Sequence, residues 1–164
     1  MASAKTKEFE IYSDLTITTT AGNTVLDLSD YVDVADNEVF ALDEWDVVLN
    51  PTDTWPTTET ELIIQMADSN ISDFVSHADR TSIGVGRLLL NNTTEAGRTL
   101  FSQFDLAHDD TGQPTLIVSK NLWVRTDAVG NTPNSLSIRL RGKIVKPSAK
   151  DYMALVLTQT GNLA

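Results

Sequence analysis

The feature that most restricts the fold of this chain is the spacing of its apolar residues. They come in short runs with a period of two residues, rich in β-branched side chains, and the runs end at Gly, Pro, Asn or Asp. A period of two is typical of strands, because successive side chains of a strand point to opposite faces. About eight such runs, with little helical periodicity, predict an all-β fold: an antiparallel sandwich of two sheets.

We expect this sandwich to be of jelly-roll type and to form a single domain over residues 1–164. An immunoglobulin-like sandwich is the competing topology. It normally needs fewer residues, and its typical cysteine pair is absent because the chain contains no cysteine. Residues 1–8 are predicted to form a flexible arm. Since the first residues are polar where a signal peptide needs an apolar stretch, we expect folding without export through a cleaved signal.

The segment SLSIRLRGKIV has the alternation of a strand with one face in the core. Leu136, Ile138 and Leu140 are predicted to point inward. Arg139 and Arg141 then point outward on the same face, and Lys143 continues that row unless Gly142 introduces a bulge. We expect the row to pair with acidic side chains of an adjacent strand or of an adjacent copy. The subunit-interface candidates on this strand are Arg139, Arg141 and Lys143.

Beyond Pro147 the pattern changes to that of a short C-terminal helix over residues 148–160. Ser148 with an acid three residues later is a typical helix start, and Gly161 is a typical stop. The apolar residues of this helix cover too much of its circumference for contact with one surface only. Two alternatives follow: a helix packed into the end of its own sandwich, or one that also contacts a neighbouring subunit. The interface candidates here are Tyr152, Met153 and Leu157.

Charge is distributed unevenly along the chain. The net charge is −11; residues 1–110 carry 21 acidic and 5 basic side chains, whereas residues 111–164 carry 2 and 7. Such a chain does not wrap nucleic acid by neutralising phosphates, so we expect no sequence-specific nucleic-acid binding. The asymmetry indicates attraction within the fold, between copies, or between the basic end and an anionic surface.

No motif in the sequence predicts catalysis, and we expect no enzyme activity and no cofactor. His77 and His108 each precede acidic residues, but no nucleophile motif accompanies them, so loop positions explain them better. An acidic run could supply oxygen ligands to calcium between subunits, but it lacks EF-hand spacing, and a solvated acidic face is the favoured interpretation, with no metal site. The run consists of Asp27, Asp30, Asp33, Asp36 and Glu38.

The plan of the chain resembles a known family of viral proteins. The stretches that carry the resemblance are TVLDLSDYV, ALDEWDVVLNP, and IRLRGKIV followed by SAKDYMALVLTQ. They are similar to the small major capsid proteins of icosahedral viruses built from single vertical jelly rolls, the sphaerolipovirus-like group. The resemblance implies a virion protein that forms homo-oligomeric capsomers and a shell. A second capsid protein and an internal membrane are partners that it also suggests.

The tryptophans suggest a second class, a carbohydrate-binding or adhesive sandwich. Such modules stack sugars on exposed indole rings. Trp45 and Trp123 lie in candidate strands among apolar neighbours, so we expect both in the core. Trp55 precedes Pro56 in a polar loop, where it could contact a ligand or a subunit or anchor the loop, and it completes the interface candidates. Two or more exposed indoles along one face would favour the binding module.

Overall fold

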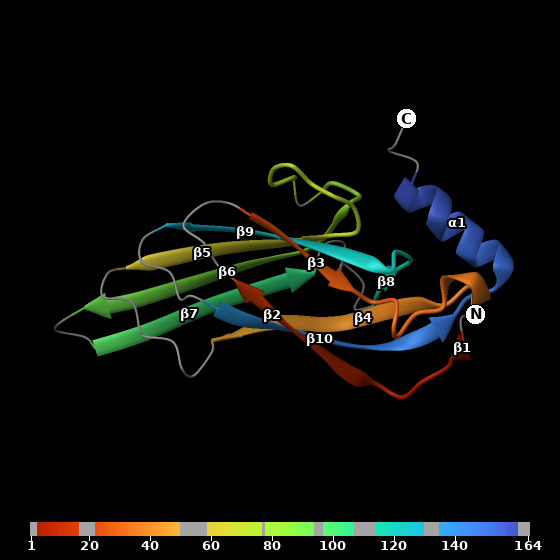
Figure 1. Ribbon diagram of the computed structural model, residues 1–164, viewed down its shortest axis with the longest axis horizontal. Coiled ribbons are helices and arrows are strands. Elements are labelled where there is room, and N and C mark those ends of the chain that lie inside the picture. Colours follow the sequence, from red (N-terminus) through yellow and green to blue (C-terminus); the bar gives the residue numbers. More distant parts are fainter. Residues whose placement is uncertain are drawn as a thin grey trace.

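The computed structural model describes residues 3–16, 22–49, 59–76, 78–93, 97–106, 114–129 and 135–160. Within these residues the chain forms strands and a single α-helix at its C-terminal end (Figure 1). The elements are β1 (Ser3–Ala4), β2 (Phe9–Thr16), β3 (Gly22–Asp27), the 3-10 turn Val34–Asp36, β4 (Val39–Leu49), β5 (Thr60–Ala67), β6 (Ser82–Thr93), β7 (Gly97–Leu106), β8 (Thr115–Ile117), β9 (Asn121–Val129), β10 (Ser135–Lys146) and α1 (Ala149–Thr160).

The strands form two antiparallel sheets that lie face to face (Figure 1). Sheet A has the order β2-β10-β4-β8, and β1 pairs with β10 beyond the end of β2. Sheet B has the order β3-β9-β5-β6-β7. Apart from β7, which extends sheet B, this is the strand order of a jelly roll, in which eight strands form two Greek keys. The predicted all-β jelly-roll sandwich with a short C-terminal helix is confirmed.

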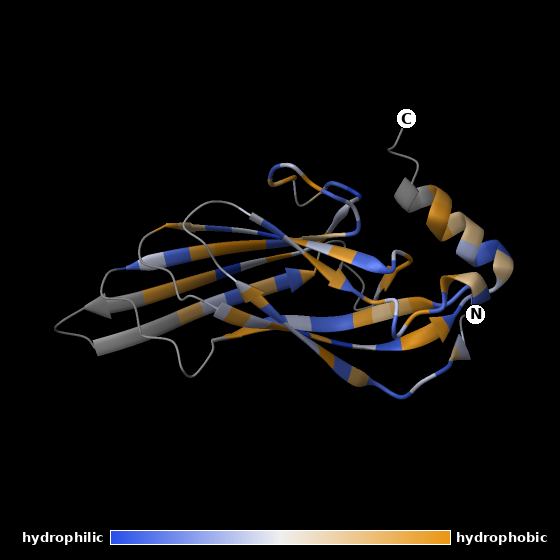
Figure 2. Ribbon diagram, in the orientation of Figure 1, coloured by the Kyte–Doolittle hydropathy of each residue, from blue (hydrophilic) through white to orange (hydrophobic). Residues whose placement is uncertain are grey.

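The core lies between the inner faces of the two sheets. Hydrophobic and hydrophilic residues alternate along the strands, as Figure 2 shows. Leu136, Ile138 and Leu140 are fully buried, so the predicted inward face of β10 is confirmed. The largest side chains with almost no exposed surface are Leu15, Leu28, Phe40, Leu42, Leu62, Ile64, Met66, Leu88, Leu90, Ile117, Leu122 and Leu136.

A register shift in β4 changes the face to which its residues point. Arg141 pairs with Glu44 but Gly142 pairs with Leu42, so Asp43 is the extra residue of a bulge. Before the bulge, Phe40 and Leu42 point into the core, and after it Trp45 does. Simple alternation along the sequence would put Val39 and Ala41 on the same face as Trp45, but the bulge places them on the opposite face.

The segment TLIVSKNLWVRTD is one nearly continuous run of β-forming residues, but it forms two strands in different sheets. β8 pairs with β4 in sheet A, and β9 pairs with β3 and β5 in sheet B. Ser119 supports the crossing, since its hydroxyl donates to the carbonyl of Asn121 at 2.7 Å and accepts from the amide of Asn121 at 3.1 Å. The three intervening residues therefore move the chain from one sheet to the other.

The N-terminal residues that the structure describes lie along β10. The first residues, expected as a flexible arm over 1–8, follow the edge of β10 from residue 3 onward. Ser3 and Ala4 pair with Lys146 and Val145, and the amide of Lys5 donates to the carbonyl of Ile144 at 2.9 Å. None of the helices in the described residues is long and apolar enough to cross a membrane.

Candidate functional site

The outward face of β10 carries the predicted row of basic residues, and strands on both sides supply acids to it. Arg139 lies between Tyr12 of β2 and Asp46 of β4. Its guanidinium makes two hydrogen bonds to the Asp46 carboxylate, of which the bond from Nε to Oδ1 is 2.8 Å long. This two-point contact is the preferred geometry of an Arg–carboxylate pair.

Arg141 lies between Glu10 of β2 and Glu44 of β4 and bridges the two strands. Its Nη2 is 3.0 Å from Glu10 Oε1, its Nη1 is 2.9 Å from Glu44 Oε2, and its Nε is 3.6 Å from Glu8. The pKa of Glu10 is lowered, first by the hydrogen bond from the Tyr12 hydroxyl and then by Arg141. The same contacts raise the pKa of both arginines, mainly through the carboxylates that they bind.

These contacts decide between the two partners expected for the arginine row. The acids of an adjacent strand in the same chain provide the pairing, so the charge asymmetry of the sequence produces attraction within the fold. Lys143 stays on the face of Arg139 and Arg141, because the extra residue of the bulge belongs to β4 and not to β10. An additional role of Arg139, Arg141 and Lys143 between copies stays a prediction.

Reversing one charge tests this cluster. In the parent, the lowered pKa of Glu10 means that its contribution to stability is present above the unfolded pKa, near 4.5, and is lost as pH falls through the folded value. In Arg141→Glu the new carboxylate faces Glu8, Glu10 and Glu44, and the like charges repel one another while they are ionised. We therefore expect the variant to unfold more easily than the parent at neutral pH and to recover stability toward pH 4.5. Thermal unfolding across pH measures both slopes; parallel slopes would contradict the pairing.

Helix α1 packs on the outer face of sheet A at the end of β10. The Ser148 hydroxyl accepts from the amide of Asp151 at 3.2 Å and donates to its carboxylate at 2.8 Å, so the predicted helix start is confirmed. Tyr152 is buried in a small second core with Val39, Ala41 and Val145. Val39 and Ala41 are thus the outer-face residues that the bulge places under the helix.

Among the candidates on this helix, Tyr152 differs from Met153 and Leu157. Tyr152 stabilises its own domain and directs its hydroxyl at the carbonyl of Val34, 3.5 Å away. Met153 and Leu157 are 57% and 66% exposed and are four residues apart, which places them on one side of the helix. The helix therefore covers its own sheet with one face and leaves an apolar strip uncovered on another.

Two further exposed apolar side chains lie on the outer face of sheet B, at the two ends of a row that also contains Glu61. Phe101 of β7 and Leu89 of β6 are paired, and Leu89, Glu61 and Val129 continue the row across the sheet. Phe101 and Val129 are 57% and 67% exposed. The sequence analysis did not identify Phe101 as a candidate, because exposure at a sheet edge depends on strand order.

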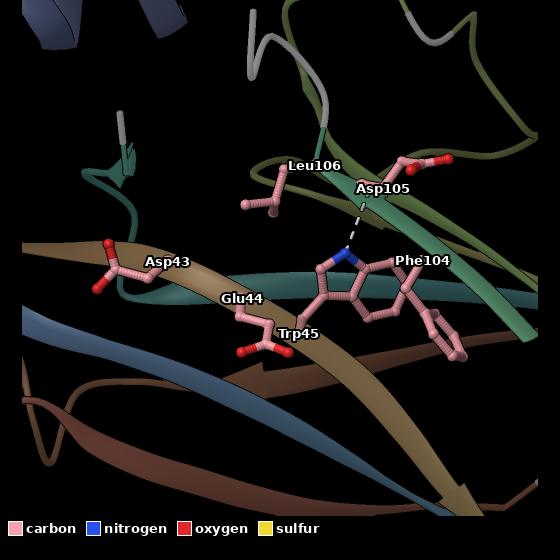
Figure 3. Close-up of a pocket in the computed structure, with 6 residues that line it drawn as sticks. All are labelled: Asp43, Glu44, Trp45, Phe104, Asp105 and Leu106. Atoms are coloured by element: carbon pink, nitrogen blue, oxygen red, sulfur yellow. Dashed lines mark hydrogen bonds between the residues drawn. The ribbon is translucent and has the colours of Figure 1, made fainter. Parts of the chain in front are cut away.

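Trp45 closes the side of the sandwich between β4 and β7 (Figure 3). Its Nε1 donates to the carbonyl of Asp105 at 3.3 Å, and its ring makes an edge contact with Phe104, with centroids 5.0 Å apart. The expected core position of Trp45 is confirmed. The ring forms the floor of a hollow of about 240 Å³, whose lining residues are Asp43, Glu44, Trp45, Phe104, Asp105 and Leu106.

The other tryptophans and both histidines have different outcomes. Trp123 was expected in the core, and this was wrong: Leu122 and Val124 occupy the inner face of β9, so Trp123 lies half-buried on the outer face. Trp55, His77 and His108 lie outside the described residues. Within the described ranges, no group of three or more His, Cys, Asp or Glu side chains is placed to hold a metal ion.

The acidic run after β3 has local partners. Asp27 accepts from the amide of Ser29 at 2.8 Å, and Asp33 caps the 3-10 turn by accepting from the amide of Ala35 at 3.0 Å. Asp36 pairs with Lys146. Glu38 differs from the expected solvated face, because it is buried and pairs with Lys5, which lowers its pKa. These acids thus stabilise turns and attach the N-terminal residues.

The loop between β5 and β6 lies over the outer face of sheet B (Figure 1), and pattern analysis did not identify its anchor. Arg125 of β9 donates to Asn23 at 3.2 Å and lies 5.5 Å from the ring centroid of Phe74 in the loop.

The same loop region contains an acid with a raised pKa. Burial, with a smaller effect of Asp79, raises the pKa of Asp68 to about 6. Only the folded loop brings these groups together, so periodicity gives no signal for them.

Comparisons with known proteins show little similarity between this chain and others. No family model matches the chain, and no curated protein matches it. One similar solved structure is a chain from Desmodium yellow mottle tymovirus. It has 10% sequence identity and a TM-score of 0.40, with 85% of this chain and 86% of that chain covered.

Proposed function

We propose that this protein is a structural subunit that associates with copies of itself into a viral capsid shell, as a major capsid protein located in the virion. The observation that carries the proposal is that large apolar side chains are exposed on two separate sides of a jelly roll: Met153 and Leu157 on α1, and Phe101 and Val129 on sheet B. Exposed apolar surface supports a contact with another copy. A subunit that tiles a closed surface needs contacts on more than one side.

The proposal also includes more specific statements about the activity of the subunit, its assembly and the sheet that supports it. The subunit acts as a structural protein and not as an enzyme. Copies associate into capsomers, the capsomers form the shell, and a second capsid protein and an internal membrane are the further partners that the proposal includes. The arginine row stabilises sheet A, on which helix α1 packs, because Arg139 ties β10 to β4 and Arg141 ties β10 to both β4 and β2.

The carbohydrate-binding or adhesive sandwich is less well supported. That function requires exposed indole rings along one face. Trp45 is buried, and Trp123 is half-buried on the outer face of sheet B. The described residues therefore offer no pair of exposed indoles on which a sugar chain could stack.

Electron microscopy of the purified protein, together with light scattering over a range of protein and salt concentrations, tests the proposal. We expect particles or discrete oligomers whose mass rises with protein concentration. They should persist at high salt, because salt screens charges but does not weaken apolar contacts in the same way. A protein that stays monomeric at high concentration under all salts and binds a defined glycan would contradict the capsid function and favour the adhesive module.

A further inference from the structure

The two sheets of this sandwich end in strands of very different character. An edge strand presents unpaired backbone N–H and C=O groups and can pair with another chain unless charge, a bulge, short length or a cover prevents it. Among the described residues, the edges of sheet A are β2 on one side and, on the other, β8 with the part of β4 beyond it. The edges of sheet B are β3 and β7.

Three of these edges are protected. β2 carries Glu10 and Asp14, which would face each other if two copies paired around Tyr12. The uncovered part of β4 begins at a bulge and is acidic. β3 is only six residues long, and Asn23 at its start donates to the carbonyl of Ile71 in the β5–β6 loop at 2.7 Å.

The edge strand β7 lacks the short length, the bulge and the central charges of the other edges; near its end, the carbonyl of Asp105 accepts from Nε1 of Trp45 at 3.3 Å. It spans Gly97–Leu106, pairs with β6 along its whole length, and no described strand pairs with its other side. No charged residue occurs between Arg98 and Asp105. At its middle, Phe101 points to the outer face and is 57% exposed.

We propose that β7 is a two-fold contact between copies of this chain, in which the β7 strands of two subunits pair antiparallel around Phe101 and join their B sheets into one continuous sheet. The two-fold axis is normal to the sheet, so both subunits keep their cores on the same side. Directly opposite residues must then share a face, and their two numbers must add up to an even sum.

The register centred on Phe101 satisfies this condition and avoids charge repulsion. Residue 97 lies opposite 105 of the second copy, 99 opposite 103, and 101 opposite 101. Arg98 then faces Phe104 and Asp105 faces Gly97, so no like charges are opposed. The two Phe101 rings meet on the outer face, where cross-strand aromatic pairs are favourable. A register centred on Ser102 gives equal overlap but places Phe101 opposite Gln103, without the aromatic pair.

Because the chain has no cysteine, a single introduced thiol reports this contact directly. Opposite residues of antiparallel strands have Cα atoms about 4.5–5.5 Å apart, within the range that a disulfide spans. We expect Phe101→Cys to form a disulfide-linked dimer under mild oxidation. Tyr12→Cys is the matched control, because Tyr12 is an aromatic edge residue of β2 that is also 57% exposed. Dimer formation by Phe101→Cys should be at least about tenfold faster, since paired strands raise the effective thiol concentration.

Further cysteines determine the register. Gln103→Cys should not cross-link with itself, because the two thiols would be about 14 Å apart along the strands. Mixed with Thr99→Cys, it should form a mixed dimer. A Ser102→Cys dimer in place of the Phe101→Cys dimer would overturn the Phe101 register. Equal rates for Phe101→Cys and Tyr12→Cys would overturn the contact itself.

A charge variant tests the contact without oxidation. Phe101→Asp places two carboxylates across the axis, so sedimentation should show loss of the dimer while thermal unfolding stays near that of the parent, because Phe101 is exposed. Association of Phe101→Asp equal to that of the parent would contradict the inference. The β7 contact itself does not depend on the proposed function; only the role of this contact in a shell rests on it. Shells from Phe101→Asp would leave the capsid function standing without this contact, whereas β7-linked dimers without shells would leave the contact standing without the capsid function.

Discussion

Replacing Trp45 with alanine is expected to lower the free energy of unfolding by about 3–5 kcal/mol, the usual cost of deleting a large buried aromatic ring. Trp45 is 3% exposed, contacts Phe104 edge to face, and hydrogen-bonds to the carbonyl of Asp105. Its removal opens the side of the sandwich between β4 and β7. Denaturant unfolding of Trp45→Ala measures the loss, and Trp123→Ala, at a half-buried position on the outer face, is the control with the smaller expected loss.

The same site offers a test of packing that single variants cannot give. A Cβ added at Gly84 would lie 2.6 Å from Nε1 of Trp45, so Gly84→Ala should be destabilising by about 1–3 kcal/mol in the parent chain. In the Trp45→Ala background the ring is gone and the added methyl group fills part of the cavity. The two losses should therefore add up to more than the loss in the double variant. Strictly additive losses would show that Gly84 is required for another reason.

This cluster shows what periodicity could and could not predict. Alternation correctly placed Trp45 in the core and the arginines on the outer face of β10. Gly84 and Gly86 lower the β-propensity of their segment, so the sequence alone argues against a strong strand there. The sequence does not show that both glycines face the Trp45 ring across the sandwich. The reason for glycine at these positions is a contact between segments that are distant in the sequence, and local propensity cannot predict such a contact.

The sequence also could not predict which surfaces are exposed, because exposure depends on the order of the strands in the sheets. The sequence predicted a jelly roll and a capped C-terminal helix, and both are confirmed. It could not locate the bulge at Asp43, which sends Val39 and Ala41 under the helix. It also could not show that β7 is an edge strand, because that depends on which strands pair. For this reason Phe101 was not among the interface candidates.

The structure separates two roles of helix α1 that the sequence left as alternatives. Tyr152 fills a small core over Val39, Ala41 and Val145, so the helix stabilises its own domain. Met153 and Leu157 lie on a side that the domain does not cover. An apolar helix can have both functions, because different parts of its circumference face the sheet and the solvent.

Variants of the two sides of this helix should behave in opposite ways. Tyr152→Ala is expected to lower the free energy of unfolding by about 3 kcal/mol, since it leaves a cavity above sheet A. Deleting residues 148–164 should cost several kcal/mol, because it exposes the apolar surface of Val39, Ala41 and Val145. Met153→Ser combined with Leu157→Ser should leave unfolding nearly unchanged, because both residues are already exposed.

Association should respond in the reverse sense. The double serine variant should lose assembly in light scattering while it remains folded, because the proposed contact with a neighbouring subunit uses the uncovered strip. Tyr152→Ala, measured well below its unfolding temperature, should still assemble, because the strip is intact. If the double serine variant assembled as the parent does, the helix would act only within its own domain. The shell contacts would then have to come from sheet B, where Phe101 and Val129 remain uncovered.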